Sequence, residues 1–130
     1  MDPPQVARQL IAAFSAGDMA GMRRLLADDL RAYITNRDGG VDEVAGADGY
    51  VARVQAMDLA SADFRVDITQ LVTVRQDLVL VMVEIHAARA GRSLHNHAAH
   101  LLLIPDGAVA EWWMVEALPA DSDEFWSATR

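Results

Sequence analysis

Side chains that could transfer protons are concentrated in the last third of the chain. Residues 93–116 hold three of the four histidines and two glutamates among apolar neighbours. His100 is a candidate general acid or base, because the pKa of an unperturbed imidazole lies near neutrality. Glu111 is a candidate partner, since burial without an arginine partner favours the protonated carboxyl. The alternatives are a packed His100 bonded to a backbone carbonyl and a Glu111 paired with an arginine.

Two further groups of histidine and glutamate residues have spacings that suit metal binding or a carboxylate–histidine dyad. His95 and His97 share one face of a predicted strand, and Glu116 is predicted opposite His97; such a set can bind zinc or iron(II). Glu84 and His86 share a face of an earlier strand, where the carboxylate could orient the imidazole. The alternative for the first group is a polar strand end at a barrel mouth or dimer edge, and for the second it is a strand end that meets water. No second metal signature supports the first, so we predict that no metal or other cofactor is needed.

Large apolar side chains could line a pocket for a small molecule. Trp112 and Trp113 are adjacent in a predicted strand and therefore point to opposite faces, so one of them is expected to line the pocket. Core packing is the alternative for most of the set. The candidate ligand-binding residues are Trp113, Trp112, Met114, Tyr50, Met82 and His86, with Tyr33 as a further candidate proton donor.

A hairpin must position most of these groups. Asp106-Gly107 between two apolar runs is a strong hairpin signal, which predicts paired strands over Ser93–Ile104 and Ala108–Glu116. A two-residue turn there places His100 opposite Trp113. One face then carries His100, Glu111 and Trp113, and the other carries His97, Trp112, Met114 and Glu116. A single bulge would move some of these residues to the opposite face.

The rest of the chain predicts helices followed by strands. Pro3-Pro4 opens a helix that Gly17 ends, and Asp18 caps a short second helix. This order predicts an α+β fold with helices packed on one face of an antiparallel sheet. The further predicted segments are a strand over Leu30–Thr35, a helix over Gly46–Met57, a loop over Asp58–Asp63, strands over Phe64–Arg75 and Leu78–Arg89, and a tail over Leu118–Arg130 anchored by Phe125-Trp126.

Composition excludes several classes of protein and site. A chain of 130 residues without a linker predicts one domain over residues 1–130. The net charge of −8 argues against nucleic acid and against anionic membranes as partners. All eleven basic residues are arginine and cysteine is absent, which excludes a Schiff-base lysine, disulfides and thiolate ligands. Without a long apolar run or a secretory signal, a cytoplasmic location is expected.

Four segments carry a family resemblance: Ala16-Gly17-Asp18, Arg24–Asp29, Gly46 at a helix start, and Asp106–Trp113. Together they resemble the SnoaL-like branch of the nuclear transport factor 2-like superfamily over nearly the whole chain. The resemblance implies a cone-shaped α+β barrel, in which a curved antiparallel sheet packs against three N-terminal helices around a deep pocket. It also implies a homodimer formed through the outer face of the sheet.

The superfamily includes polyketide cyclases, ketosteroid isomerases, epoxide hydrolases, dehydratases and non-catalytic ligand-binding members. A Glu-His-Trp-Asp run typical of the cyclases falls on Glu111–Met114, which puts Met114, unable to transfer a proton, at the acid/base position. A cyclase histidine falls at about His100. We therefore predict a pocket for a small hydrophobic molecule and cofactor-independent proton transfer, with His100 as base and Glu111 or Tyr33 as partner. The alternative is a non-catalytic ligand-binding or dimeric assembly module.

Overall fold

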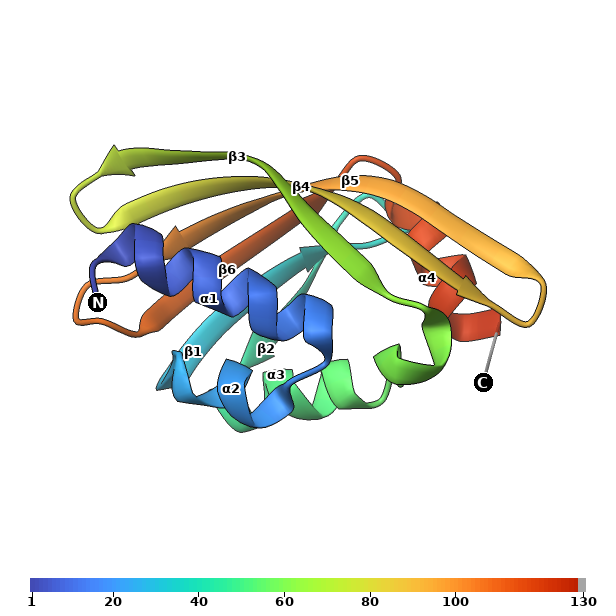
Figure 1. The fold of residues 1–130 in the computed structure, drawn as a ribbon, viewed down its shortest axis with the longest axis horizontal. Coiled ribbons are helices and arrows are strands. Elements are labelled where there is room, and N and C mark those ends of the chain that lie inside the picture. Colours follow the sequence, from blue (N-terminus) through green and yellow to red (C-terminus); the bar gives the residue numbers. More distant parts are fainter. Residues whose placement is uncertain (129–130) are drawn as a thin grey trace.

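The computed structural model describes residues 1–128, which form four α-helices, one 3₁₀-helix and six strands (Figure 1). The strands form one sheet in the order β2-β1-β6-β5-β4-β3. The α+β prediction is confirmed, although the sheet is mixed because β1 and β6 run parallel. The elements are α1 (Pro3–Ala16), α2 (Met19–Arg24), β1 (Leu26–Thr35), β2 (Val41–Ala45), α3 (Ala47–Gln55), η1 (Leu59–Ala62), β3 (Arg65–Arg75), β4 (Leu78–Arg89), β5 (Arg92–Leu103), β6 (Val109–Glu116) and α4 (Pro119–Ala128).

The first helix begins and ends where its capping residues require. The Asp2 carboxylate accepts a hydrogen bond from the Gln5 backbone N–H at 3.0 Å, and the Gln5 side chain accepts one from the Asp2 N–H at 3.0 Å. These bonds satisfy two of the free donors at the helix start. Gly17 ends the helix with a φ of 68°, a left-handed conformation that suits glycine. The buried side of α1 packs against β3 and β4.

Helices α1, α2 and α3 lie over one face of the sheet, and α4 lies beside the far ends of β4 and β5 (Figure 1). The sheet face toward the helices carries the buried side chains of β4 and β5. These residues belong to the same core cluster as the buried faces of α1 and α3. No helix within residues 1–128 lies over the opposite, outer face of the sheet, which remains partly exposed (Figure 1). No helix within residues 1–128 is long and apolar enough to span a bilayer.

The register of the β5–β6 hairpin differs by one residue from the predicted register. His100 pairs with Met114, and Leu102 pairs with Trp112. The predicted two-residue turn is wrong, because Ile104 and Val109 are held by other segments. The Ile104 N–H donates to the Asp77 carbonyl at 2.7 Å, and the Val109 N–H donates to the Leu25 carbonyl at 2.8 Å.

The shifted register reverses the predicted faces of β6. Trp112, Met114 and Glu116 share the inner face with His100, whereas Glu111 and Trp113 lie on the outer face. A one-residue change has this effect because successive side chains of a strand point to opposite sides.

Three elements were absent from the sequence prediction. Strand β2 was not assigned because all five of its residues are partly or fully exposed, so it lacks the apolar alternation of a half-buried strand. The predicted tail contains helix α4, which begins at Pro119 and buries Phe125. The predicted loop over Asp58–Asp63 likewise contains the short helix η1.

Candidate functional site

A cavity of about 420 Å³ lies between the inner face of the sheet and the surrounding helices. Its volume falls in the range of about 300–1,000 Å³ that is usual for small-molecule sites. Eleven of its seventeen lining residues are apolar or aromatic. The lining residues are Phe14, Ile34, Tyr50, Val54, Ala56, Met57, Phe64, Ile85, Leu94, Met114 and Trp126, with Asp42, Arg53, Glu116, Ser122, Asp123 and Ser127 as the polar contributors.

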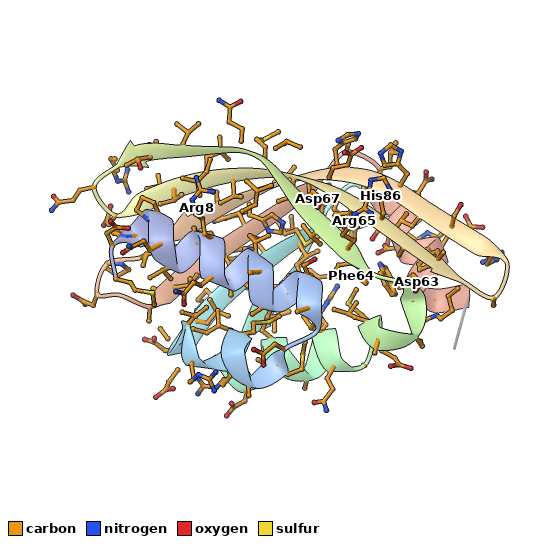
Figure 2. The ribbon with its side chains drawn as sticks, viewed as in Figure 1. Arg8, Asp63, Phe64, Arg65, Asp67 and His86 are labelled. Atoms are coloured by element: carbon orange, nitrogen blue, oxygen red, sulfur yellow. The ribbon has the colours of Figure 1, made fainter. Side chains whose placement is uncertain are left out.

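Aromatic rings form one wall of this cavity. Phe14 from α1 stacks on Phe64 with ring centroids 5.3 Å apart, and Phe64 meets Trp126 from α4 edge-on at 5.8 Å. Figure 2 shows Phe64 on the side of the sheet that faces the helices. Arg89 lies over the Trp126 ring at 5.4 Å and donates to the Met57 carbonyl at 2.9 Å, which ties α4 to the segment after α3. Three elements distant in the sequence are thereby joined around the cavity.

Glu116, the last residue of β6, is a buried carboxyl in the cavity wall, with only 8% of its surface exposed. One of its carboxylate oxygens accepts a hydrogen bond from the Asn96 amide at 3.2 Å. Asn96 is itself fixed, because its amide donates to the Leu118 carbonyl at 3.1 Å and its oxygen accepts from the Leu118 N–H at 3.1 Å. The Glu116 N–H donates to the Thr35 hydroxyl at 3.0 Å. Both backbone and side chain of Glu116 are therefore held in place.

Burial raises the pKa of Glu116 to about 7, because the cavity solvates the ionised carboxylate poorly. A hydrogen bond from Ser122 favours the ionised form, and the nearby Asp123 opposes it. At neutral pH this carboxyl is populated in both protonation states. A group of this kind can both donate and accept a proton, as general acid–base chemistry requires.

An ion pair forms the more exposed part of the cavity wall. Arg53 of α3 donates to Asp42 of β2 at 3.0 Å, and the Asn36 amide donates to the other Asp42 oxygen at 3.0 Å. The hydrogen bond from Asn36 and that from Arg53 lower the pKa of Asp42, so this carboxylate stays ionised. The cavity thus combines a fixed charge pair with one carboxyl that titrates near neutrality.

Tyr50 of α3 lies in the cavity wall and packs against Trp112 with ring centroids 4.5 Å apart. Burial is the main cause that raises the pKa of its phenol, and the neighbouring Glu116 adds to the effect. The phenol therefore keeps its proton and can act as a hydrogen-bond donor toward the cavity.

The predicted base His100 lies on the inner face of the sheet, beneath the residues that line the cavity. Its Nδ1 accepts a hydrogen bond from the Trp112 indole at 2.8 Å. Burial lowers the pKa of His100 to about 4, so the imidazole is neutral at pH 7. Of the pair that the resemblance singled out, Met114 lines the cavity and His100 does not.

Trp112 is buried on the inner face without lining the cavity, and the remaining predicted site residues lie on the outer face. Tyr33 and Trp113 stack there with ring centroids 4.1 Å apart, and the Trp113 indole donates to Glu111 at 2.6 Å. Met82 is exposed on the same face. His86 also lies there, as Figure 2 shows. Of the six predicted ligand contacts, only Met114 and Tyr50 belong to the cavity wall.

The predicted metal set of His95, His97 and Glu116 is not brought together, because Glu116 lies on the inner face. Glu84 takes its place, since β4 and β5 pair so that Glu84 lies opposite His97. The ligand atoms of Glu84, His95 and His97 all lie within 4.8 Å of one another. Among residues 1–128, these three form the group that could hold a metal ion.

Several cavity residues were not predicted from the sequence. Arg53 and Asp42 meet across two elements, one of which was not assigned, and Asp123 lies on a helix predicted as a tail. Glu116 was considered only as a metal ligand. The available signal was its position at the end of an alternating strand, where the correct register would have placed it with Met114 on the inner face.

Residues 7–112 match the SnoaL-like domain family. Curated relatives in Mycobacterium tuberculosis and Mycobacterium bovis, both described as uncharacterised proteins, are 24% identical over 92% of each chain. Among solved structures, Bal32a from a soil-derived mobile gene cassette superposes with a TM-score of 0.82 at 18% identity, covering 94% of both chains.

Two further solved structures are similar to this chain. An LEH-like epoxide hydrolase from Mycobacterium tuberculosis has a TM-score of 0.74 at 15% identity, covering 92% of this chain and 85% of its own. A candidate polyketide cyclase from Pseudomonas putida has a TM-score of 0.69 at 19% identity, covering 88% and 90%. These structures support the fold alone, since enzymes of different chemistry share it. The match over most of its length shows that the chain belongs to the SnoaL-like domain family and has the nuclear transport factor 2-like fold.

Proposed function

We propose that the protein binds a small, mostly apolar molecule in the cavity and exchanges a proton with it through Glu116. The observation that carries this proposal is a buried carboxyl with a pKa of about 7 in a largely aromatic and aliphatic wall. The reaction class is isomerisation, cyclisation or dehydration without a cofactor. The family assignment is compatible with this class but does not select within it.

The wall favours a ligand with a large apolar body and one polar group. Phe14, Phe64 and Trp126 offer ring faces and edges, while polar side chains gather around Glu116 and the Arg53–Asp42 pair. A ketone or enone satisfies both halves of this environment. The ligand oxygen could accept a hydrogen bond from the Tyr50 phenol, which burial keeps protonated.

The proposed step is proton transfer at a carbon next to a carbonyl. The Glu116 carboxylate takes the proton, the C–H electron pair moves toward the carbonyl oxygen, and the protonated carboxyl then returns the proton to another carbon. Because the pKa of Glu116 is about 7, both directions of transfer are available at neutral pH. No redox change or external co-reactant is involved.

The test is hydrogen–deuterium exchange at the α-carbon of a panel of cyclic ketones and enones in D₂O, followed by proton NMR. We expect the wild-type protein to accelerate exchange, with a rate that rises with pH through about 7 as Glu116 ionises. Glu116→Gln should reduce the enzymatic rate by about a hundredfold or more, the usual contribution of a general base. Retained exchange in this variant would overturn the assignment.

Glu111→Gln is the matched control, because it also removes a glutamate carboxyl from β6, but from the outer face of the sheet. Loss of exchange in Glu111→Gln, with Glu116→Gln active, would favour the catalytic pair predicted from the sequence.

The second candidate function is ligand binding without catalysis, favoured by Met114 in the cavity at the acid/base position of the cyclases. It predicts that the ketones bind, as judged by NMR line broadening, with no exchange in any variant.

A further inference from the structure

Three of the four histidines gather on the outer face of β4 and β5, on the opposite side of the sheet from the cavity. His86 lies opposite His95 in the pairing, and Glu84 lies opposite His97. The His86 and His95 rings stack with centroids 4.6 Å apart, and the His95 and His97 rings are 5.2 Å apart. Their side chains are accessible, with 57% of His95 and 32% of Glu84 exposed. This cluster has no part in the proposed proton transfer.

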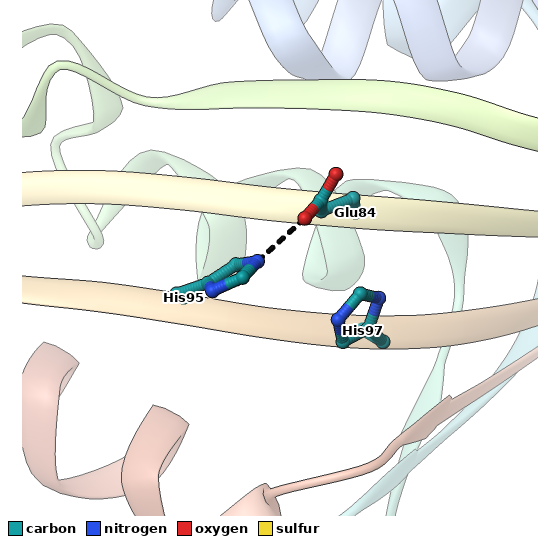
Figure 3. A group of neighbouring side chains, drawn as sticks. All are labelled: Glu84, His95 and His97. Atoms are coloured by element: carbon teal, nitrogen blue, oxygen red, sulfur yellow. Dashed lines mark hydrogen bonds and ion pairs between the residues drawn. The ribbon is translucent and has the colours of Figure 1, made fainter.

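The geometry within the cluster is that of potential metal ligands. The Glu84 carboxylate contacts the His95 Nε2 at 2.5 Å (Figure 3). One ligand atom from each of Glu84, His95 and His97 lies within 4.8 Å of the others. Donors on a tetrahedral zinc ion with bonds of about 2.0–2.1 Å lie roughly 3.4 Å apart, so small rotations of exposed side chains bring the three into range.

The backbone beneath the cluster is rigid, which favours a defined site. Strands β4 and β5 pair without interruption from Leu78–Leu103 to Arg89–Arg92. The connecting turn uses Ala90 and Gly91 with φ of 54° and 77°, as in the tight hairpin turns that fix register. Ligands on paired strands are held more precisely than ligands on loops.

We propose that Glu84, His95 and His97 form a binding site for a divalent transition-metal ion of the zinc class on the outer face of the sheet. Two imidazoles and one carboxylate suit Zn²⁺, and water completes the coordination. Metal binding replaces the hydrogen bond between His95 and Glu84, because both side chains become ligands. His86 stacks on His95 at 11° between the ring planes and orients that ring without itself being one of the three ligands.

Zinc chloride is the probe, added to tag-free protein that has been stripped with chelator and exchanged into buffer. Calorimetric titration should show one saturable zinc site per chain. In parallel, NMR spectra of the imidazole groups should show zinc-dependent shifts of His95 and His97, with His100 unchanged because it is buried on the opposite face. The absence of saturable binding, or shifts confined to other histidines, would overturn the proposal.

Single substitutions define the ligand set. His95→Gln, His97→Gln and Glu84→Gln should each weaken zinc binding by about tenfold or more, since even outer-shell partners contribute about 10–100-fold. All three residues are at the surface, and equal melting temperatures in chelator will show that the variants fold. Unchanged affinity in all three would contradict the site.

Glu43→Gln is the matched control, because it removes an exposed carboxylate from the distant strand β2 and changes the net charge by the same amount. It should bind zinc like the wild type, whereas weakening equal to that of Glu84→Gln would mean that net charge alone attracts the ion. His86→Gln should weaken zinc binding less than His95→Gln does. An equal loss of zinc affinity in the two variants would mean that His86 is itself a ligand, and would contradict the three-residue set. These results are independent of the exchange assay, because the two sites lie on opposite faces of the sheet.

Discussion

The Trp112 indole N–H donates to the Nδ1 of His100 at 2.8 Å, across the β5–β6 pair and inside the core. Both side chains are essentially inaccessible to solvent. The bond requires a neutral imidazole with its proton on Nε2, which agrees with the lowered pKa of His100. His100 therefore satisfies a buried indole donor.

This bond predicts an unusual order of stability among His100 variants. His100→Asn offers an amide oxygen close to the position of Nδ1, whereas His100→Leu leaves the Trp112 N–H buried without an acceptor. An unsatisfied buried donor costs about 1–3 kcal/mol. We expect His100→Leu to have the lower free energy of unfolding in urea although leucine is more apolar. Equal or greater stability of His100→Leu would contradict this role.

The raised pKa of Glu116 predicts a loss of stability with rising pH. Between about 4.5, its ordinary value, and about 7, the unfolded chain has released this proton and the folded chain has kept it. The contribution of Glu116 is therefore fully present below pH 4.5 and is lost as pH rises to 7, by about 3 kcal/mol. Glu116→Gln should abolish this decline in urea unfolding between pH 6.5 and 8, above the range in which His100 opposes it. An unchanged slope would show that the carboxyl is ionised when folded.

His100 has the opposite effect on stability. Its folded pKa of about 4 lies below the ordinary value of 6.5, so the folded protein loses stability as pH falls from 6.5 toward 4. In the wild-type protein the two groups oppose each other between pH 4.5 and 6.5. Glu116→Gln should therefore show a steeper loss of stability as pH falls below 6.5. His100→Asn should show a steeper loss of stability as pH rises toward neutrality.

The outer face of the sheet predicts a homodimer. Met82 and Val115 are exposed there, next to the half-buried leucines of β4 and β5, and no helix within residues 1–128 covers them. Apolar surface of this kind usually marks an interface. Sedimentation velocity at micromolar concentration should show a dimer that Met82→Glu dissociates. Leu118→Glu, which adds the same charge at an exposed position off the sheet, should leave the dimer intact. A wild-type monomer would contradict the prediction.

Folding should not depend on a metal ion. The sheet is held by continuous strand pairing, and the cluster of buried apolar side chains forms on the opposite side from the outer-face ligands, so neither needs a metal ion. Chelator should leave the melting temperature of metal-free protein unchanged, while added zinc should raise it through preferential binding to the folded state. Unfolding in chelator would show that the metal has a structural role.

The sequence predicted the long elements and failed where local pattern carries little information. Strand β4 was predicted with its observed bounds, since its buried and exposed residues alternate throughout. Strand β2 has no buried residue, so only its pairing with β1 identifies it. The parallel contact between β1 and β6 joins segments about eighty residues apart and leaves no signal in either one.

The site was harder to predict because it depends on register. Asp106-Gly107 correctly marked the hairpin, but the loop is longer than two residues, since Ile104 and Val109 bond to Asp77 and Leu25. Glu116 also lies beyond the segment that matches the family, which ends at residue 112. The carboxyl in the cavity therefore could be recognised only after the fold had placed it.

The loop between β5 and β6 determines which alternate residues of β6 face the cavity. Its length delivers Trp112, Met114 and Glu116 to the interior and leaves Glu111 and Trp113 outside. The two sets differ in chemistry, although they alternate along the same eight residues. In this architecture a gain or loss of one loop residue that shifts the register would replace all three inward-facing side chains at once. Relatives that share the fold can thus exchange one set of reactive groups for another without altering any residue of the strand itself.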